Sequence, residues 1–380
     1  MKNVISLLTN NFKHDNRVLK ECTTLSKAGY NVTIVALHAE GLAVKEILKN
    51  KLKVHRIQLK SRNWSKNRII QLFKYAEYFY HLVKHHRKAD IIHCNDIEPL
   101  PLAVMMKWFF NRKLKIIYDA HELEFDKKEK GSGYYPQAIL ALTEKILIKN
   151  TDAMITVTPL IAEAYAKRYN IIPPKLVMNC PTYKTYVPSK DIFRKKFNIR
   201  ADQKIYLYQG GLLPKRGIEE ILTAFEQLDN QYVIVFIGFG PLVNSVKKAV
   251  KENDNIFFHD AVSQAELPNF TCSADFGFCL LQGSTKNHQF ALGNKIFEYI
   301  QARLPILCSN MPGFKLIMED NMGIVIQNHN NIPAIKDASQ EIQLLDPLKY
   351  LKALELAAKK YNWENQEKVL LDIYEGLYEK

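Results

Sequence analysis

The sequence lacks any apolar run long enough to cross a membrane. The longest apolar stretch, residues 97–110, is interrupted by Glu98, two prolines and Lys107. It falls short of the roughly 18 to 20 residues that a membrane-spanning helix needs. The apolar residues 4–8 are too few for the core of a signal peptide, and no small-residue cleavage site follows them. We therefore expect neither an integral membrane protein nor a secretory signal.

Cysteine pairs are also missing. The six cysteines are scattered, without a Cys-x-x-Cys pair or a neighbouring histidine cluster, at positions 22, 94, 180, 272, 279 and 308. Most of them lie in apolar segments that resemble strands, so buried reduced thiols fit better than disulfides or a zinc site.

What is present indicates an ordinary globular protein. The 380 residues are enough for two domains, and 47% hydrophobic with 24% charged residues excludes wholesale disorder and a fibrous architecture.

The positive charge is unevenly distributed. The formal net charge is +14, but residues 1–185 carry +15 and residues 186–380 carry −1. Residues 45–88 alone hold 13 basic side chains against Glu46 and Glu77. We therefore expect the first half of the chain to bind an anionic partner.

Short apolar runs alternate with helical patterns along the chain, which is typical of parallel α/β units. Strands are expected near residues 3–8, 31–37, 53–59, 90–94, 114–119, 153–157 and 175–179, and after a linker at 180–189 near 204–209, 232–238, 255–258, 275–281, 305–309 and 323–327. Helices are expected near 16–28, 65–86, 98–110, 136–149, 159–169, 217–228, 241–252, 264–271, 294–302 and 346–360. The sequence thus predicts an α/β protein with two Rossmann-like, doubly wound domains facing a cleft.

The helix expected at 65–86 allows two interpretations. Ile69, Leu72, Phe73, Ala76, Tyr80 and Val83 form an apolar stripe at helical spacing, surrounded by basic side chains. The stripe either packs on the sheet beneath a solvated basic face or lies on an anionic membrane surface.

Two strand ends in the first half carry polar side chains. The turn after the first strand contains Asn11, Asp15 and Arg17, with Asp15 suited to cap the following helix. It lacks the glycines of a dinucleotide fingerprint, which argues against NAD. His121 follows the strand near 114–119, and the charged, glycine-containing residues 124–135 after it suit a lid or acceptor loop.

The second half carries features typical of a nucleotide-phosphate site. Gly210 and Gly211 end a strand just before Lys215 and Arg216, and Gly238 and Gly240 form a second small-residue turn. Glycine lets a phosphate approach the backbone, and the cations supply opposite charge.

A further helix start adds to this pattern. Gly293, Asn294 and Lys295 begin a helix whose amides and ammonium suit a diphosphate, and Glu298 lies one turn inside it. A carboxylate at that place can accept hydrogen bonds from ribose hydroxyls, or it can be a surface residue that suits the helix dipole.

In the order of these motifs the sequence resembles a family-4 glycosyltransferase of the GT-B fold. The resemblance covers almost the whole chain and is most specific at residues 293–299 with 302–306. It implies a retaining, metal-independent hexosyltransferase without a cofactor, which uses a nucleoside-diphosphate sugar. His121, Arg216, Lys295 and Glu298 would be the catalytic residues, the glycines with Lys215 and Asn294 the donor site, and Asn11, Asp15 and Arg17 the acceptor side.

Three positions depart from the family's pattern. Phe290 stands where the first of two paired glutamates is expected, Gly210 where many members have an arginine, and Asn10-Asn11 where many have glycines. This chain has no carboxylate at the position of the first glutamate, so the contacts with the sugar that this glutamate would make are in question.

The resemblance also implies a domain plan and a setting. An acceptor-side domain would span 1–183, with a terminal helix at 362–380 packing back on it, and a donor domain would span 190–361. The acceptor would be a glycan or a lipid-linked molecule in cell-surface polysaccharide synthesis, at the cytoplasmic face of an anionic membrane bound through residues 45–88.

Two other functions stay open. A non-hydrolysing nucleotide-sugar epimerase shares the fold. The +14 charge could instead suit nucleic acid, but only 11 of the 53 basic residues are arginine and the aromatic residues follow helical spacing. Specific nucleic-acid binding is therefore not expected.

Overall fold

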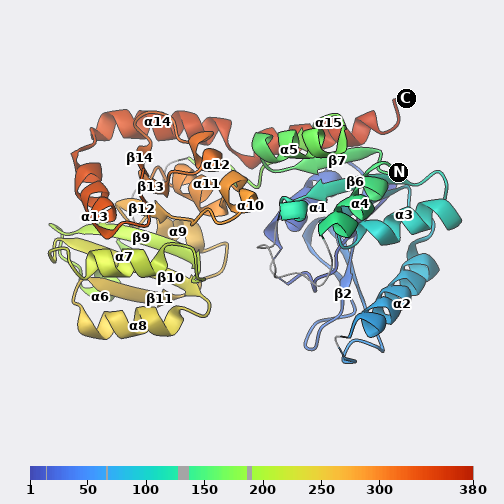
Figure 1. Cartoon of the computed structure of the whole chain (residues 1–380), viewed down its shortest axis with the longest axis horizontal. Coiled ribbons are helices and arrows are strands. Elements are labelled where there is room, and N and C mark those ends of the chain that lie inside the picture. The colour runs from blue at the N-terminus through green and yellow to red at the C-terminus, as the bar shows by residue number, and fades with distance from the viewer. Residues whose placement is uncertain (14, 66, 127–136, 186–190, 380) are drawn as a thin grey trace. The chain divides into compact units, whose positions relative to one another are not determined.

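The computed structural model describes residues 1–13, 15–65, 67–126, 137–185 and 191–379 (Figure 1). The chain forms two compact units. The N-terminal unit comprises Met1–Met178 with Gln366–Lys380, and the C-terminal unit comprises Asn179–Asn365. Two doubly wound α/β units were predicted, and this part of the prediction is confirmed.

The N-terminal unit is built on an eight-stranded sheet in the order β3-β4-β2-β1-β5-β6-β7-β8, parallel except for β3. Its strands are β1 (Asn3–Leu7), β2 (Asn31–Leu37), β3 (Lys45–Ile47), β4 (Lys53–Ile57), β5 (Ile91–Asn95), β6 (Lys115–Ala120), β7 (Ala153–Thr156) and β8 (Lys175–Leu176). Its helices are α1 (Asn16–Lys27), α2 (Arg68–His86), α3 (Leu100–Phe109), α4 (Gln137–Ile148) and α5 (Pro159–Tyr169), with α15 (Trp363–Gly376) returning to the unit from Gln366 onward.

The C-terminal unit is built on a six-stranded parallel sheet in the order β11-β10-β9-β12-β13-β14. Its strands are β9 (Lys204–Gly211), β10 (Tyr232–Phe239), β11 (Ile256–Asp260), β12 (Phe276–Cys279), β13 (Ile306–Ser309) and β14 (Gly323–Ile326). Its helices are α6 (Ile192–Phe197), α7 (Ile218–Phe225), α8 (Val243–Glu252), α9 (Leu267–Thr271), α10 (Lys286–Phe290), α11 (Asn294–Gln301), α12 (Pro312–Lys315), α13 (Ile332–Glu341) and α14 (Pro347–Lys360).

Both sheets reverse their winding direction beside their first strand. In the N-terminal unit β1 lies between β2 and β5, and in the C-terminal unit β9 lies between β10 and β12. Ligands of doubly wound sheets bind at the carboxyl ends of the strands at such a reversal. The topology therefore directs attention to the ends of β1, β5 and β6 and to the ends of β9 and β12.

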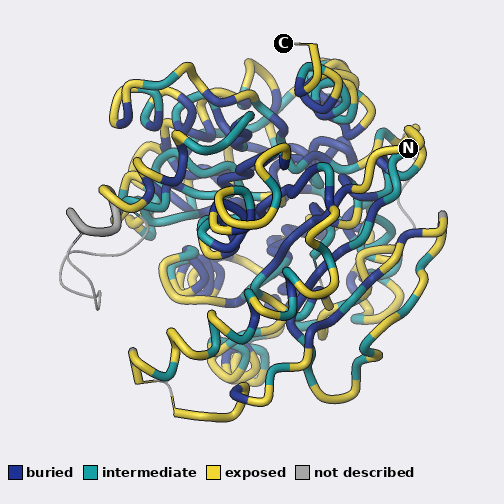
Figure 2. The backbone as a smooth tube through the Cα atoms, turned by 90° about the vertical axis from the view of Figure 1, so that its right-hand side faces the viewer, coloured by how far each residue is buried: buried dark blue, intermediate teal, exposed yellow. Residues whose placement is uncertain are grey.

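The strands are apolar on both faces because helices cover both sides of each sheet. Figure 2 shows dark-blue buried strands inside and yellow exposed surfaces on the helices around them. The core of the C-terminal unit contains a group of aromatic rings, with Tyr206, Phe225 and Phe278 fully buried and in ring contact.

Capping residues explain where several helices begin and end. The Asp15 side chain accepts a hydrogen bond from the Val18 amide and starts α1. Thr158 does the same for α5, whose first residue is Pro159. Asn170 then ends α5 in the left-handed conformation, at φ 52°.

The boundaries between the units differ from the predicted ones. The predicted first domain ended at residue 183, but residues 179–183 lie in the C-terminal unit. Their backbone is tied there, because the Pro181 carbonyl accepts from the Trp363 amide (2.8 Å) and the Tyr183 amide donates to Glu364 (2.9 Å). The predicted second domain at 190–361 is accordingly too short at both ends. Residues 186–190 of the predicted linker lie outside the described residues.

Several short elements were not predicted. They include β3, α6, α10, α12 and α13, which are short or weakly periodic in sequence. Of the predicted acceptor loop at 124–135, residues 127–135 lie outside the described residues. Within the part of the chain that the structure covers, no helix is both long enough and apolar enough to cross a membrane.

Candidate active site

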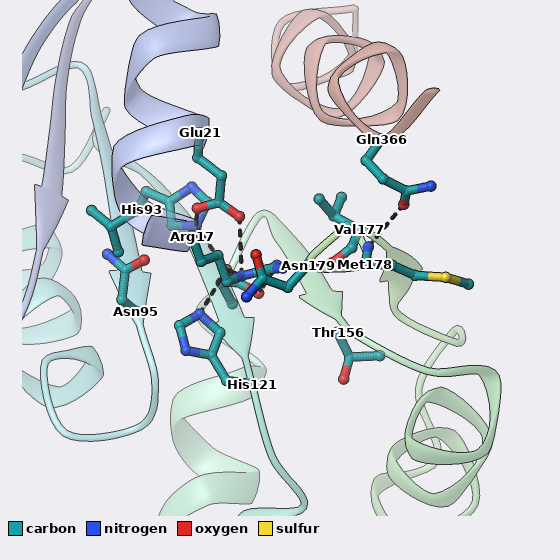
Figure 3. Close-up of polar contacts among 12 residues, drawn as sticks. Arg17, Glu21, His93, Asn95, His121, Thr156, Val177, Met178, Asn179 and Gln366 are labelled. Atoms are coloured by element: carbon teal, nitrogen blue, oxygen red, sulfur yellow. Dashed lines mark hydrogen bonds and ion pairs between the residues drawn. The ribbon is translucent and has the colours of Figure 1, made fainter. Parts of the chain in front are cut away.

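A network of charged side chains lies at the ends of β5 and β6 in the N-terminal unit (Figure 3). The fully buried Asp119, near the end of β6, accepts two hydrogen bonds from the Arg17 guanidinium of α1, at 2.9 Å from Nε and 2.8 Å from Nη2. Burial alone would raise the pKa of Asp119, but Arg17 and then His121 hold it well below its usual range. Asp119 is therefore an ionised carboxylate inside the unit.

His121 stands between two carboxylates. Its Nε2 lies 3.0 Å from Asp119 Oδ2 and its Nδ1 lies 3.3 Å from Asp96 Oδ2, and its side chain is 21% exposed. Burial lowers its pKa, but the two carboxylates outweigh this and raise the pKa well above the ordinary value. His121 is thus an imidazolium at neutral pH, able to donate hydrogen bonds but not to act as a base.

A residue that contacts the acceptor substrate must be exposed, and Arg17 is not. It is almost fully buried, pairs with Asp119 and with Glu21 one turn along α1 (3.1 Å), and donates to the Val177 carbonyl (2.7 Å). These contacts occupy the guanidinium, so the predicted acceptor-side role is corrected. Arg17 positions Asp119 and, through it, His121.

The other two predicted acceptor-side residues lie in the turn after β1. Asp15 caps α1 and also accepts a hydrogen bond from the Asn10 side chain (3.3 Å). Asn11 is half-buried, and its carbonyl accepts from Arg56 Nε (3.0 Å). Both residues lie on the same edge of the sheet as His121, because they follow the carboxyl end of β1.

A metal ion does not fit the charged network. Among the residues that the structure describes, Glu21, His93 and Asp119 form a group whose donor atoms lie within 4.8 Å of one another. Arg17 already pairs with both carboxylates of this group. A guanidinium in that place repels a second cation.

The C-terminal unit places the predicted donor residues at the reversal between β9 and β12. Gly210, at the end of β9, has φ +110°, and a Cβ there would lie 3.9 Å from Lys295 Cε. Lys295 comes from the first turn of α11, whose N-cap is Gly293. Residues 85 positions apart in the chain thus meet at one edge of the sheet.

Lys295 is the most unusual side chain of this edge. It is 8% exposed, its Nζ has no hydrogen-bond partner among the residues that the structure describes, and the atom lies 3.6 Å from the centre of the Tyr208 ring. Burial, with a further contribution from the nearby Arg216 charge, lowers the pKa of Lys295 to about 8. The Glu298 carboxylate is close enough to raise the pKa of Lys295, but it forms no hydrogen bond with the ammonium. A buried cation without a hydrogen-bonded anion is unfavourable, so this site has the character of an anion site.

Glu298 is held in place by a buried amide. Gln209 Nε2 donates to Glu298 Oε2 (2.6 Å), and Gln209 Oε1 accepts from the Thr271 hydroxyl (2.8 Å). Gln209 and Thr271 are both buried, which fixes the direction of the amide. The sequence analysis missed Gln209, although a polar residue between the buried Tyr208 and two glycines is a visible signal.

The remaining predicted donor residues are found around this edge. Lys215 is exposed, at φ +65°, and its carbonyl accepts from the Gln282 amide (3.0 Å). The exposed Asn294 accepts a hydrogen bond from Asn179 (3.1 Å). Phe290, at the end of α10, is half-buried and brings no carboxylate to the site.

Gly238 and Gly240 are explained by backbone packing. A Cβ on Gly238 would lie 1.8 Å from the Gly210 carbonyl oxygen, and one on Gly240 would lie 2.5 Å from the Leu212 carbonyl oxygen. Both positions therefore require glycine whether or not a donor binds nearby. Gly211 has no such restriction, because its Cβ would meet only the Leu213 side chain at 3.5 Å.

The chain is similar to glycosyltransferases along both units. Residues 16–179 match the family model described as Glycosyltransferase Family 4, and residues 189–362 match the one described as Glycosyl transferases group 1. The uncharacterized glycosyltransferase YqgM of Bacillus subtilis is 24% identical over 205 residues, which are 50% of this chain and 54% of the relative. The O-antigen biosynthesis glycosyltransferase WclY of Escherichia coli is 27% identical over 248 residues, 61% of this chain and 64% of the relative. The chain thus spans less than two thirds of the length of both relatives.

Solved structures match over the whole chain. Sucrose-phosphate synthase from Thermosynechococcus elongatus has a TM-score of 0.78 at 17% identity, covering 100% of this chain and 99% of that one. Anabaena HepE in complex with UDP and glucose has a TM-score of 0.74 at 13% identity, covering 99% and 100%. At these identities the likeness establishes the fold. The two halves of the chain thus match two glycosyltransferase family models in turn, and the chain as a whole has the GT-B fold.

Proposed function

We propose that this protein transfers a hexose from a nucleoside-diphosphate sugar to a glycan or lipid-linked acceptor, with retention of configuration. The observation that carries the proposal is Lys295, a buried ammonium beside Gly210 that has no hydrogen-bond acceptor within the described part of the chain. A diphosphate would supply a hydrogen-bonded anion, and the positive end of α11 and the Arg216 charge would add to its binding.

Two similar structures support a nucleotide donor. HepE was solved in complex with UDP-glucose, and the catalytic domain of starch synthase IV from Arabidopsis thaliana was solved bound to ADP and acarbose. For this chain, we propose that Glu298, which Gln209 holds in place, accepts hydrogen bonds from the ribose. Because Phe290 replaces the first carboxylate of the family's pattern, sugar recognition would rely on other groups.

The proposed reaction needs no enzyme nucleophile. The bond between the sugar C1 and the phosphate oxygen breaks, and the acceptor oxygen bonds to C1 on the same face. The acceptor's proton passes to the departing phosphate oxygen. Lys295 and Arg216 would stabilise the negative charge that grows on the diphosphate, which is the kind of preorganised electrostatic effect that dominates many enzymes.

In the N-terminal unit, His121 would contribute a fixed positive charge to catalysis, because the carboxylates of Asp119 and Asp96 face both of its ring nitrogens. Its two carboxylate partners keep it protonated, and Arg17 keeps Asp119 in place. We further propose that the reaction takes place in the cytoplasm, in polysaccharide synthesis, and needs neither a metal ion nor another cofactor.

The test is nucleotide binding combined with product analysis. Calorimetry with UDP, GDP and ADP identifies the base, and a screen of the matching sugar donors identifies the transferred sugar. Lys295→Gln should weaken diphosphate binding about 10- to 100-fold, because it removes a charged hydrogen bond. Lys248→Gln, on the exposed part of α8, is the matched control and should bind as the wild type does.

Unchanged binding by Lys295→Gln would overturn the site assignment. An epimerised donor without any transfer product would instead identify a nucleotide-sugar epimerase of the same fold.

A further inference from the structure

Helix α2 carries an apolar stripe on its outer face. Ile69, Leu72, Phe73 and Tyr80 are 64%, 68%, 59% and 59% exposed, and Ala76 between them is exposed as well. At about 100° per residue these positions fall within roughly 100° of the helix circumference. They form one continuous stripe.

The same helix has a second apolar face that holds it on the sheet. Tyr78 and Leu82 are buried, and the Tyr78 hydroxyl donates to the Leu8 carbonyl (2.6 Å). Tyr78 lies about half a turn away from the middle of the outer stripe. The outer stripe is therefore not needed for packing inside the unit, and its exposure calls for another partner.

The end of α3 continues this surface. The Phe79 ring contacts the Phe110 ring, with centroids 5.9 Å apart, so the two helices meet there. Trp108, Phe109 and Phe110 are all exposed. Figure 1 shows α2 and α3 together on the outside of the N-terminal unit. We call Ile69, Leu72, Phe73, Tyr80, Phe109 and Phe110 the apolar face.

Basic side chains lie at the C-terminal end of the stripe on α2. Residues 45–88 carry a net charge of +11. Lys84, next to the stripe, lies 5.8 Å from the Tyr80 ring centre, and Arg87 and Lys88 are exposed at the end of the helix. The two acids of the segment are engaged locally, since Glu77 accepts hydrogen bonds from Ser61 and Glu46 pairs with Arg56.

We propose that the apolar face docks on an anionic lipid bilayer. Exposed aliphatic and aromatic side chains beside lysines fit the boundary between acyl chains and headgroups, with the lysine amines reaching the lipid phosphates. A second copy of the chain is a poorer partner, because two faces of the same positive charge would repel each other. Nucleic acid would match the charge but leave the Ile and Leu side chains without a partner.

This inference goes beyond the proposed transferase function and does not depend on it. The sequence left two positions for the stripe, packed on the sheet or on a membrane surface, and the exposure of the stripe now favours the second. A membrane-docked unit would work close to a lipid-linked acceptor.

The test is flotation of the full chain with vesicles, without donor or acceptor. Vesicles of 30% phosphatidylserine in phosphatidylcholine should bind at least tenfold more protein than vesicles of phosphatidylcholine alone, and added salt should weaken the binding. The double variant Leu72→Ser/Phe73→Ser should lose at least tenfold, and Lys84→Gln/Lys88→Gln should lose binding only to the anionic vesicles.

The matched control is Leu348→Ser/Leu356→Ser, which removes two exposed leucines of α14 in the C-terminal unit. It should float like the wild type. Thermal melting checks that all three double variants fold, which is expected because all six substituted side chains are exposed.

Three outcomes would overturn the proposal. The first is equal binding to neutral and anionic vesicles, and the second is wild-type binding by Leu72→Ser/Phe73→Ser. The third is a wild-type protein that does not bind vesicles but binds an oligonucleotide or forms a dimer in solution, when the Leu72→Ser/Phe73→Ser or Lys84→Gln/Lys88→Gln variant loses that binding or dimer. Because the assay measures no catalysis, a failure here leaves the transferase proposal standing.

Discussion

Among single residues, Asp119 organises the charges of the N-terminal unit. One carboxylate binds Arg17 through two hydrogen bonds, accepts from His121 at 3.0 Å, and lies 3.5 Å from His93 Nε2. These partners come from α1, β5 and the residues after β6, so a single side chain joins three segments of the sheet edge.

We expect Asp119→Asn to destabilise the N-terminal unit by about 3–5 kcal/mol. The substitution leaves the Arg17 and His121 charges buried without their shared carboxylate. Urea unfolding measures the loss. The control is Asp202→Asn. Asp202 and its partner Arg200 are both exposed, so this variant should unfold like the wild type. Equal stability of the two variants would contradict this account of the network.

Two histidines of the N-terminal unit predict a dependence of stability on pH. His55 Nδ1 lies 2.8 Å from His86 Nε2, and burial, followed by neighbouring charges, lowers the pKa of both to about 4. Below about pH 6.5 the unfolded chain binds protons at these positions, while the folded chain does so only near pH 4. Their contribution therefore lowers the stability as the pH falls from about 6.5 to 4.

Thermal melting between pH 7.5 and 4.5 tests this. The double variant His55→Gln/His86→Gln should lose less of its melting temperature on acidification than the wild type loses. If both proteins lose the same amount, the two histidines do not control the response.

At the scale of secondary-structure elements, the close pairing of β9 and β10 depends on one glycine. Gly238 lies opposite Gly210 in the parallel register, with no room for a side chain before the Gly210 carbonyl oxygen. The strands must therefore separate if any other residue stands there.

We expect Gly238→Ala to cost the C-terminal unit more than about 3 kcal/mol or to prevent its folding, because the new Cβ clashes with backbone rather than with a flexible side chain. Denaturant unfolding gives the magnitude. The control is Gly376→Ala, near the end of α15, where a Cβ meets nothing within 4 Å. A stable Gly238→Ala protein would show that the strands can separate at little cost.

At the scale of the whole molecule, the last residues of the chain complete the first unit. Tyr374 of α15 is fully buried, and its hydroxyl lies 2.9 Å from His93 Nδ1. The Gln366 side chain accepts from the Met178 amide (2.8 Å), and Thr24 donates to Glu367 (2.9 Å). The N-terminal unit is thus assembled from both ends of the chain.

We expect Tyr374→Ala to destabilise the N-terminal unit by about 3–5 kcal/mol, because it leaves a cavity and removes the hydrogen-bond partner of His93 Nδ1. Hydrogen exchange of the full chain, resolved by peptide, should show lost protection in β1 and β5 while the C-terminal unit keeps its protection. Tyr378→Ala, at a half-exposed position near Lys2, is the control and should change little. Equal loss of protection in both units would mean that α15 does not belong to one of them.

Much of the fold was predictable because it is locally encoded. The alternation of Val- and Ile-rich strands with amphipathic helices depends on neighbours in the chain, and so do the caps at Asp15 and Thr158. Short elements such as β3 and α13 were missed because three to ten residues carry too little periodic signal. The boundary at 183 was late because residues 179–183 are placed by partners at 363 and 364.

The sequence by itself determined that the chain has two α/β units, that the excess charge lies in the first, and that Gly210, Lys295 and Glu298 are candidates for one site. Tertiary structure alone decided that Arg17 is buried against Asp119, 102 positions away, that Lys295 finds no acceptor among the described residues, and that the stripe of α2 faces outward. The physical reason is the same in each case. Periodicity says which residues share a face, but burial and charge pairing depend on what folding brings against that face.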